Sequence, residues 1–316
     1  MKTFKKGEVL PIRDGYGKAL LHLGQTNPNV IVLDADLAKS TRSDWFANTY
    51  PKRFIDVGIA EQNMVGIAAG LALCGQIPFV TTYGVFIAGR AFDQLRNTVC
   101  FSNLNVKVIG SHGGISVGPD GGSHQAIEDI ALMNVLPNMQ VFSPVDAVEA
   151  YQITLYVASI NSPVFIRLAR EATEIVLNED YLFHPGKMNY LHKGDDAYLI
   201  SHGTIGVECL KSAQKLKQFG INVSAINCSS IKPFDNAELL NIAKTNKPIF
   251  IVEEHLQAGG LGSIISTFLA QHYPRKLYFL NLGDCFGESG NPDELLDKYN
   301  LSVNKITDFI KLQIDK

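Results

Sequence analysis

The sequence predicts an α/β protein with two doubly wound domains, each built around a mainly parallel sheet. Two observations support this prediction. Short runs of β-branched and other apolar residues alternate along the chain with longer segments of helical character, a pattern typical of parallel sheets covered by helices. A polar, turn-rich segment then interrupts the alternation from residue 175 to residue 192. Because such composition marks a connection, it indicates a linker between two α/β units.

The first unit is predicted to span residues 1–185, including the linker from about residue 175. Its apolar runs are too short for helices and lack polar alternation, as expected of strands buried on both faces of a sheet. We expect its strands at residues 30–33, 54–57, 78–82, 106–110, 140–142 and 164–167. We expect its main helices from Glu61 onward, at 90–96 and at 146–158.

The second unit is predicted to span residues 186–316 and to repeat the same architecture. We expect its strands at residues 197–201, 222–227 and 248–252, and its helices at 207–218 and 262–272. A glycine-rich helix start at residues 259–262 is one candidate for an anion site. We favour packing and a dimer contact there.

Composition excludes several classes of protein. The 316 residues are 46% hydrophobic and 19% charged, as in ordinary globular proteins. A net charge of −3 gives no electrostatic basis for binding nucleic acid or a membrane surface. No apolar segment follows the basic N-terminal residues, and no apolar run is long enough for a membrane span, so we expect neither signal peptide nor membrane anchor. Five widely spaced cysteines suggest core thiols in a cytoplasmic protein.

Residues 58–64, Gly-Ile-Ala-Glu-Gln-Asn-Met, place the carboxylate of Glu61 at the start of a helix rich in glycine and alanine. Small residues let another helix or subunit approach closely, so we expect Glu61 to be buried at an interface. A buried carboxylate is costly unless it is paired or hydrogen-bonded, and such groups are frequent where a protein exchanges a proton with a ligand. The alternative is a carboxylate that the helix dipole favours at an N-terminus.

Residues 111–125 combine five glycines with His112, Asp120 and His124. Glycine at this density favours unusual φ angles and close approach of the backbone to a ligand. Histidine titrates near neutrality and can donate a hydrogen bond to a phosphate or hydroxyl group. A metal site is the weaker interpretation, because nothing else in the chain has matching ligand spacing.

These motifs resemble the transketolase family. The resemblance covers nearly the whole chain, in the expected order, and rests on residues 58–64, 81–86, 118–125, 231–235 and 252–255. It implies that thiamine diphosphate is the cofactor. It also implies that the reaction moves a two-carbon ketol unit from a phosphorylated ketose to an aldose.

The resemblance also implies roles for individual residues. Glu61 is expected to bond the aminopyrimidine ring of the cofactor and to exchange a proton with it, and His124 to assist proton transfer at the sugar oxygens. The residues expected near the cofactor are Asp36, Tyr83 and Phe86. Those expected to hold the sugar phosphate are Arg13, Ser40, His112 and Arg170. Asp120 and His124 are expected to contact the hydroxyls or the reacting carbonyl of the substrate. Taken singly, each fits core packing, a strand-end turn or a surface charge.

The chain departs from the family pattern at two places. Gly89 stands where many transketolases have a tyrosine, so we expect one wall of the cofactor pocket to differ. The Gly-Asp-Gly motif that holds the diphosphate through Mg²⁺ is incomplete at residues 194–196 and 283–285. We therefore expect no metal ligand in this chain, and an N-terminal transketolase subunit as the partner that ligates Mg²⁺. Two copies of each chain, self-associating across a dimer interface, would form a heterotetramer.

Three alternative functions remain open. The beta subunit of a 2-oxoacid dehydrogenase has a similar length, but its substrate has no phosphate to explain the arginines. A deoxyxylulose phosphate synthase normally joins both halves in one chain. A non-catalytic regulatory subunit would tolerate the loss of Glu61, His124 or Arg170, and all three are present. The sequence does not specify the sugar.

Overall fold

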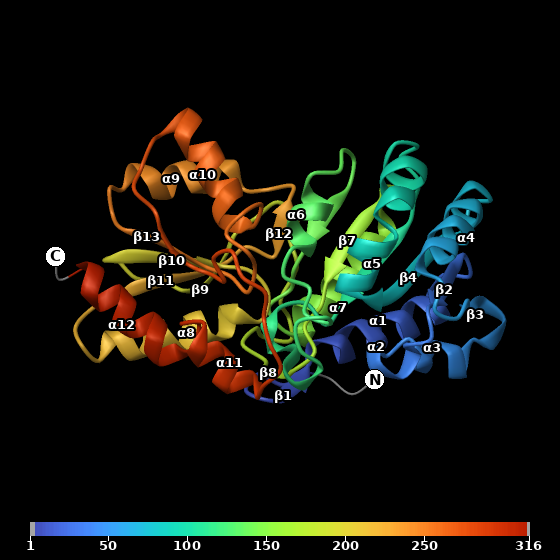
Figure 1. Ribbon diagram of the computed structural model, residues 1–316, viewed down its shortest axis with the longest axis horizontal. Coiled ribbons are helices and arrows are strands. Elements are labelled where there is room, and N and C mark those ends of the chain that lie inside the picture. The colour runs from blue at the N-terminus through green and yellow to red at the C-terminus, as the bar shows by residue number, and fades with distance from the viewer. Residues whose placement is uncertain (1–3, 315–316) are drawn as a thin grey trace.

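The computed structural model describes residues 4–314 and shows two α/β units side by side (Figure 1). The larger sheet has seven strands, in the order β12 (Ser230–Lys232), β6 (Gln140–Phe142), β7 (Val164–Arg167), β5 (Lys107–Ser111), β4 (Ile77–Tyr83), β2 (Val30–Asp34) and β3 (Phe54–Asp56). All its neighbouring strands are parallel except β12 and β6. The predicted doubly wound, mainly parallel architecture is confirmed for this unit.

Helices cover both faces of the larger sheet (Figure 1). On one face α1 (Ile12–Thr26) packs beside α7 (Ala147–Ser159), and on the other lie α4 (Glu61–Leu73) and α5 (Gly84–Arg90). Successive strand residues point to opposite faces. Val32 therefore packs under α1, whereas Leu33 packs under α4. Shorter helices, α2 (Ala38–Thr41), α3 (Asp44–Thr49) and α6 (Asp129–Asn134), lie in the connections.

The smaller sheet has five strands, in the order β14 (Tyr278–Leu280), β13 (Ile249–Val252), β10 (Ala197–Ser201), β11 (Val223–Asn227) and β9 (Asn189–His192). All its neighbours are parallel except β11 and β9, so the second predicted sheet is confirmed as well. One face is covered by α8 (Ile205–Lys217) and α12 (Val303–Ile314), and the other by α9 (Asn236–Lys244) and α10 (Leu261–His272). A further helix, α11 (Pro292–Lys298), packs on the 3₁₀ turn Ile115–Asp120. A two-stranded ribbon joins β1 (Val9–Pro11) to β8 (Ala172–Glu174).

Several local predictions are wrong. The expected linker does not extend to residue 192, because Asn189–His192 forms β9 and pairs with β11. The helix expected at residues 90–96 begins earlier, at Gly84, and a π-helix follows at Gln94–Cys100. β12 belongs to the second half of the sequence but pairs with β6 of the first sheet. Two cysteines expected near the core, Cys74 and Cys285, are exposed.

None of the helices in the described part of the chain has the length and apolar character that a membrane crossing requires.

Candidate functional site

The predicted site residues gather at the carboxyl edge of the larger sheet. Asp36 follows β2, Tyr83 ends β4, His112 follows β5 and Arg170 follows β7. These four strands are neighbours and run parallel, so their carboxyl ends meet at one edge. In open α/β sheets this edge is the usual place for a ligand.

Four aromatic rings form a cluster at this edge. The ring of Tyr83 stacks on His112, with 3.8 Å between centroids, and on Phe86, with 5.6 Å between centroids. The ring of His124 meets Phe86 edge to face at 5.4 Å and Tyr83 at 6.2 Å. Tyr83 and His112 are buried, and Phe86 and His124 are half-buried. The structure therefore brings together side chains from β4, α5 and both ends of the glycine-rich loop.

His112 is held in one orientation by its neighbours. Its backbone has φ of 62°, in the left-handed region. Arg13 Nη1 lies 3.3 Å from His112 Nε2, and Ser111 Oγ lies 2.8 Å from His112 Nδ1. Because an arginine N–H can only donate, Nε2 accepts and Nδ1 carries the proton. Burial, reinforced by the nearby cations of Arg13 and Arg170, lowers the pKa of His112 to about 3, so the ring is neutral at physiological pH.

Arg13 lies at the start of α1 among other cations. Burial lowers its pKa, and the charges of Arg42 and Arg170 lower it further, while Asp14 acts in the opposite direction. Its Nε is buried and has no hydrogen-bond partner among the described residues. Arg170 Nη1 donates to the carbonyl of Val117 at 2.6 Å. A crowded group of guanidinium ions with an unused donor favours a bound anion such as phosphate.

Glu61 is the first residue of α4, and its side chain is 4% exposed. Its Oε1 accepts a hydrogen bond from Arg90 Nη1 at 2.8 Å. The guanidinium of Arg90 also lies 4.0 Å from the ring centroid of Phe86. Glu61 and Arg90, with residues 60, 62 and 63, line a hollow of about 390 Å³. The burial of Glu61 agrees with the prediction, and its place at an interface stays a prediction.

Sequence reasoning missed Arg90, which appears only as a charged residue on an expected helix. The signal that could have revealed it is its spacing. Arg90 lies four residues after Phe86 in α5, and residues at this spacing share a helix face. Gly89 is exposed, and a Cβ built on it would meet no atom within 4 Å. The wall of the hollow beside Arg90 is therefore open at Gly89, the position where this chain departs from the family pattern.

Asp34, at the end of β2, organises the loop that carries Asp36 and Ser40. Its carboxylate accepts hydrogen bonds from the backbone N–H of Leu37 and the hydroxyl groups of Thr41 and Ser43. Burial raises the pKa of Asp34 to about 6 against the effect of these donors. A buried carboxylate with three donors from its own loop fixes the loop's conformation.

Four predicted residues make no hydrogen bond or ring contact with the ring cluster among the described residues: Asp36, Ser40, Asp120 and Arg170. Asp36 is exposed, and its backbone N–H donates to Asp56 at 3.2 Å. Ser40 is half-buried in α2, and Asp120 is exposed at the end of the 3₁₀ turn. Arg170 acts on the cluster through its charge, which contributes to lowering the pKa of His112. The contacts in the structure therefore connect only part of the predicted set.

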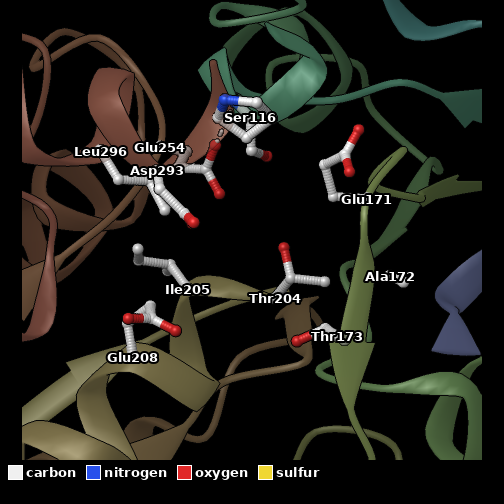
Figure 2. A pocket seen from close by; sticks show the side chains of 11 residues that line it. Ser116, Glu171, Ala172, Thr173, Thr204, Ile205, Glu208, Glu254, Asp293 and Leu296 are labelled. Carbon is white, nitrogen blue, oxygen red and sulfur yellow. Dashed lines mark hydrogen bonds between the residues drawn. The ribbon is translucent and has the colours of Figure 1, made fainter. Parts of the chain in front are cut away.

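A separate pocket of about 90 Å³ lies where the two units meet (Figure 2). Its carboxylates come from both units: Glu171 from the first, and Glu208, Glu254 and Asp293 from the second. The backbone N–H of Ser116 donates to Glu254 at 2.9 Å and ties the glycine-rich loop to the second unit. No basic side chain lines this pocket among the described residues. It is therefore unsuited to phosphate, unlike the arginine group around Arg13.

Two further candidate sites show no place for a ligand. The N-terminus of α10 is occupied by the chain's own Glu253, which accepts from the backbone N–H groups of Leu261 and Gly262 at 2.7 and 2.9 Å. Between residues 4 and 314, no group of three or more His, Cys, Asp or Glu side chains is arranged to hold a metal ion.

Comparison with known proteins places this chain in a family. Residues 8–175 match the transketolase pyrimidine-binding domain, and residues 186–306 match the transketolase C-terminal domain. A protein of Methanocaldococcus jannaschii, provisionally named as a transketolase C-terminal section, is 40% identical over 309 residues, or 96% of both chains. A 6-deoxy-6-sulfo-D-fructose transketolase subunit of a Clostridium species is 35% identical over 295 residues, or 93% of this chain and 92% of that protein.

A solved structure described as "Split gene transketolase, inactive beta4 tetramer" has the same fold. Its TM-score is 0.87 at 40% sequence identity, over 98% of this chain and 99% of that chain. The sequence similarity extends through both units. The chain therefore belongs to the transketolase family and carries the family's pyrimidine-binding and C-terminal domains.

Proposed function

We propose that this chain is the C-terminal subunit of a split transketolase, which uses thiamine diphosphate to move a two-carbon ketol unit from a phosphorylated ketose to an aldose. The observation that supports it best is an unbroken line of side-chain contacts through Glu61, Arg90, Phe86, Tyr83, His112 and Arg13. One end offers a buried carboxylate beside aromatic rings, and the other a half-buried arginine whose buried Nε has no hydrogen-bond partner among the described residues. These ends suit a pyrimidine ring and a phosphate, respectively.

The residues around Glu61 fit the aminopyrimidine end of the cofactor. The hollow is lined by the buried carboxylate of Glu61 and by Arg90, whose guanidinium lies 4.0 Å from the ring centroid of Phe86. The carboxylate offers a hydrogen bond, and the ring of Phe86 offers a stacking face. We assign Glu61 to proton exchange at a ring nitrogen, Phe86 and Tyr83 to ring orientation, and Asp36 to a position near the cofactor. When bound, thiamine diphosphate supplies the carbanion chemistry of the transfer.

The arginine group fits the anionic end of the substrate. We assign phosphate binding to Arg13, Arg170 and Ser40, with the neutral ring of His112 orienting Arg13. We assign Asp120 and His124 to the sugar hydroxyls, and His124 to proton transfer at the sugar oxygens. The Clostridium relative is named for a sulfonated sugar, and a sulfonate would satisfy the same arginines. The proposal therefore specifies an anionic ketose and leaves phosphate as the favoured anion.

The diphosphate and its Mg²⁺ are assigned to a partner, an N-terminal transketolase subunit. The solved relative made of beta chains alone is described as inactive, which supports the need for a second chain. We propose a cytoplasmic heterotetramer of two copies of each chain, with self-association across a dimer interface. We also propose that the domain division falls near residue 186, between the two matched segments.

The test is to mix this chain with its N-terminal partner, thiamine diphosphate and Mg²⁺, and to measure native mass and donor cleavage. Xylulose 5-phosphate and 6-deoxy-6-sulfo-D-fructose serve as donors, and each chain alone serves as the control. We expect a heterotetramer that cleaves an anionic ketose only when both chains are present. A pair that assembles but cleaves neither donor would contradict the proposal and favour a 2-oxoacid or regulatory function.

A further inference from the structure

Arg90 makes both contacts that the proposed function assigns to the cofactor's ring. It donates to the buried carboxylate of Glu61 at 2.8 Å, and its guanidinium lies 4.0 Å from the ring centroid of Phe86. A guanidinium group resembles an aminopyrimidine in the features that matter here: it is planar, delocalised and carries N–H donors in its plane. Two flat groups cannot use the same carboxylate oxygen and the same face of Phe86 together.

We propose that Arg90 occupies the aminopyrimidine position before the cofactor binds, and that cofactor binding displaces it. This inference rests on the proposed function. Arg90 would then be a positioning residue: it keeps Glu61 paired and Phe86 covered until the ring replaces it.

The burial of Glu61 explains why such an arrangement is favourable. An unpaired carboxylate with 4% exposure is costly, and the pair with Arg90 relieves that cost. In the described part of the chain, no other side chain hydrogen-bonds to Glu61. The face of Phe86 gains as well, since a cation above an aromatic ring is attracted to it.

The surroundings of Arg90 allow its side chain to leave. Its side chain is 48% exposed, and the position beside it, Gly89, has no atom within 4 Å of an added Cβ. Its backbone is held in place, because Gln62 Nε2 donates to the carbonyl of Arg90 at 3.0 Å. The side chain can therefore turn outward while α5 and the ring of Phe86 remain in position.

The displacement lowers the apparent affinity for the cofactor. If only a fraction of molecules has Arg90 turned outward, the apparent dissociation constant rises by the inverse of that fraction. A half-exposed ion pair together with an exposed cation–π contact favours the inward position by about tenfold. Removing Arg90 should therefore tighten thiamine diphosphate binding by about tenfold.

The experiment is titration calorimetry on the assembled two-chain complex with Mg²⁺, using thiamine diphosphate and, separately, inorganic pyrophosphate. Arg90→Ala should bind thiamine diphosphate about tenfold more tightly and pyrophosphate with unchanged affinity, because pyrophosphate lacks the ring. Arg90→Lys keeps the charge without the planar group, so its affinity for thiamine diphosphate should lie between those of the wild type and Arg90→Ala. Arg96→Ala is the matched control, since Arg96 is exposed and its guanidinium donates to Asn97.

A double-mutant cycle separates displacement from a general loosening of the fold. In a Glu61→Gln background, Arg90→Ala should improve thiamine diphosphate affinity by much less, because the pair no longer exists. Unchanged or weaker binding by Arg90→Ala in the wild-type background would overturn the inference while leaving the proposed function standing. A wild-type complex that binds pyrophosphate but not thiamine diphosphate would contradict both the inference and the proposed function.

Discussion

Glu61 and Glu149 are both buried glutamates in the first turn of a helix, and their surroundings differ in kind. Among the described residues, Glu61 has one side-chain partner, the half-exposed Arg90, and it borders a hollow. Glu149 is fully buried, and both of its oxygens accept hydrogen bonds: from the Val145 backbone and Asn227 at one oxygen, and from Tyr181 at the other.

This difference indicates that the carboxylate of Glu61 is available for chemistry, whereas that of Glu149 holds parts of the fold together. Glu149 lies where α7, the linker and the end of β11 converge, so its donors come from three parts of the chain. Because none of those donors can leave without opening the junction, Glu149 fixes structure. Glu61 can exchange its single mobile partner for another flat cation or ring. The number of fixed donors, rather than burial, distinguishes the two.

Replacing Glu61 should give the largest effect, and it should act on turnover. Glu61→Gln removes the group assigned to proton exchange, so the assembled enzyme should lose about 10²- to 10⁴-fold in kcat. Thermal unfolding should change little, because a half-exposed ion pair contributes at most about 1 kcal/mol. Steady-state kinetics and calorimetric melting of the same sample provide the check. Turnover near the wild-type value would refute the assigned role.

The opposite result is expected for Glu149. Glu149→Ala leaves buried donors unsatisfied at the junction of the two units, so the free energy of unfolding should fall by about 3 kcal/mol. Activity per folded molecule should remain close to wild type, because Glu149 touches no proposed ligand. Chemical denaturation measures the first quantity, and assays well below the melting temperature measure the second. A loss of turnover in Glu149→Ala without a loss of stability would contradict the structural role that distinguishes Glu149 from Glu61.

The pH dependence of the free energy of unfolding offers a sharper test of the burial of the Glu149 carboxyl group. Burial raises its pKa from the ordinary value of 4.5 to about 7. Between these pH values the unfolded chain releases this proton while the folded chain keeps it. Glu149 therefore makes the free energy of unfolding fall as pH rises, by at most about 1.4 kcal/mol per pH unit. In denaturant titrations from pH 4.5 to 7, the free energy of unfolding should fall less steeply with pH in Glu149→Gln than in the wild type. Equal slopes in the two proteins would contradict the assignment of the raised pKa to Glu149.

The smallest effect is expected at the open wall beside Arg90. Gly89 lies within α5 and faces open space, so Gly89→Ala should raise the free energy of unfolding by about 0.5–1 kcal/mol through helix propensity alone. Melting curves of the two proteins measure this gain. A loss of stability would show that the wall is more tightly packed than the space around Gly89 indicates.

The sequence predicts regular, self-contained features well. Apolar runs such as residues 30–33, which form most of β2, identify the strands because burial on both faces requires such residues. Glu61 is identifiable because it is the one carboxylate in a helix of mostly small, apolar residues. Features that depend on a distant partner are not predicted. In the sequence, Arg90 cannot be distinguished from an ordinary surface arginine, because its contact with Glu61 depends on how α5 packs beside α4. The three residues of β12 show no periodicity and form a strand only by pairing with β6.

That short strand has a consequence for how the molecule unfolds. β12 caps the free edge of the first sheet with chain from the second unit, and Lys232 Nζ secures it by donating to the carbonyls of Asn134 and Leu136 at 2.9 and 2.7 Å. One hydrophobic cluster also runs through both units. A fragment ending near residue 186 would expose the backbone of β6 to intermolecular pairing and aggregation. The two units should therefore melt in a single cooperative transition.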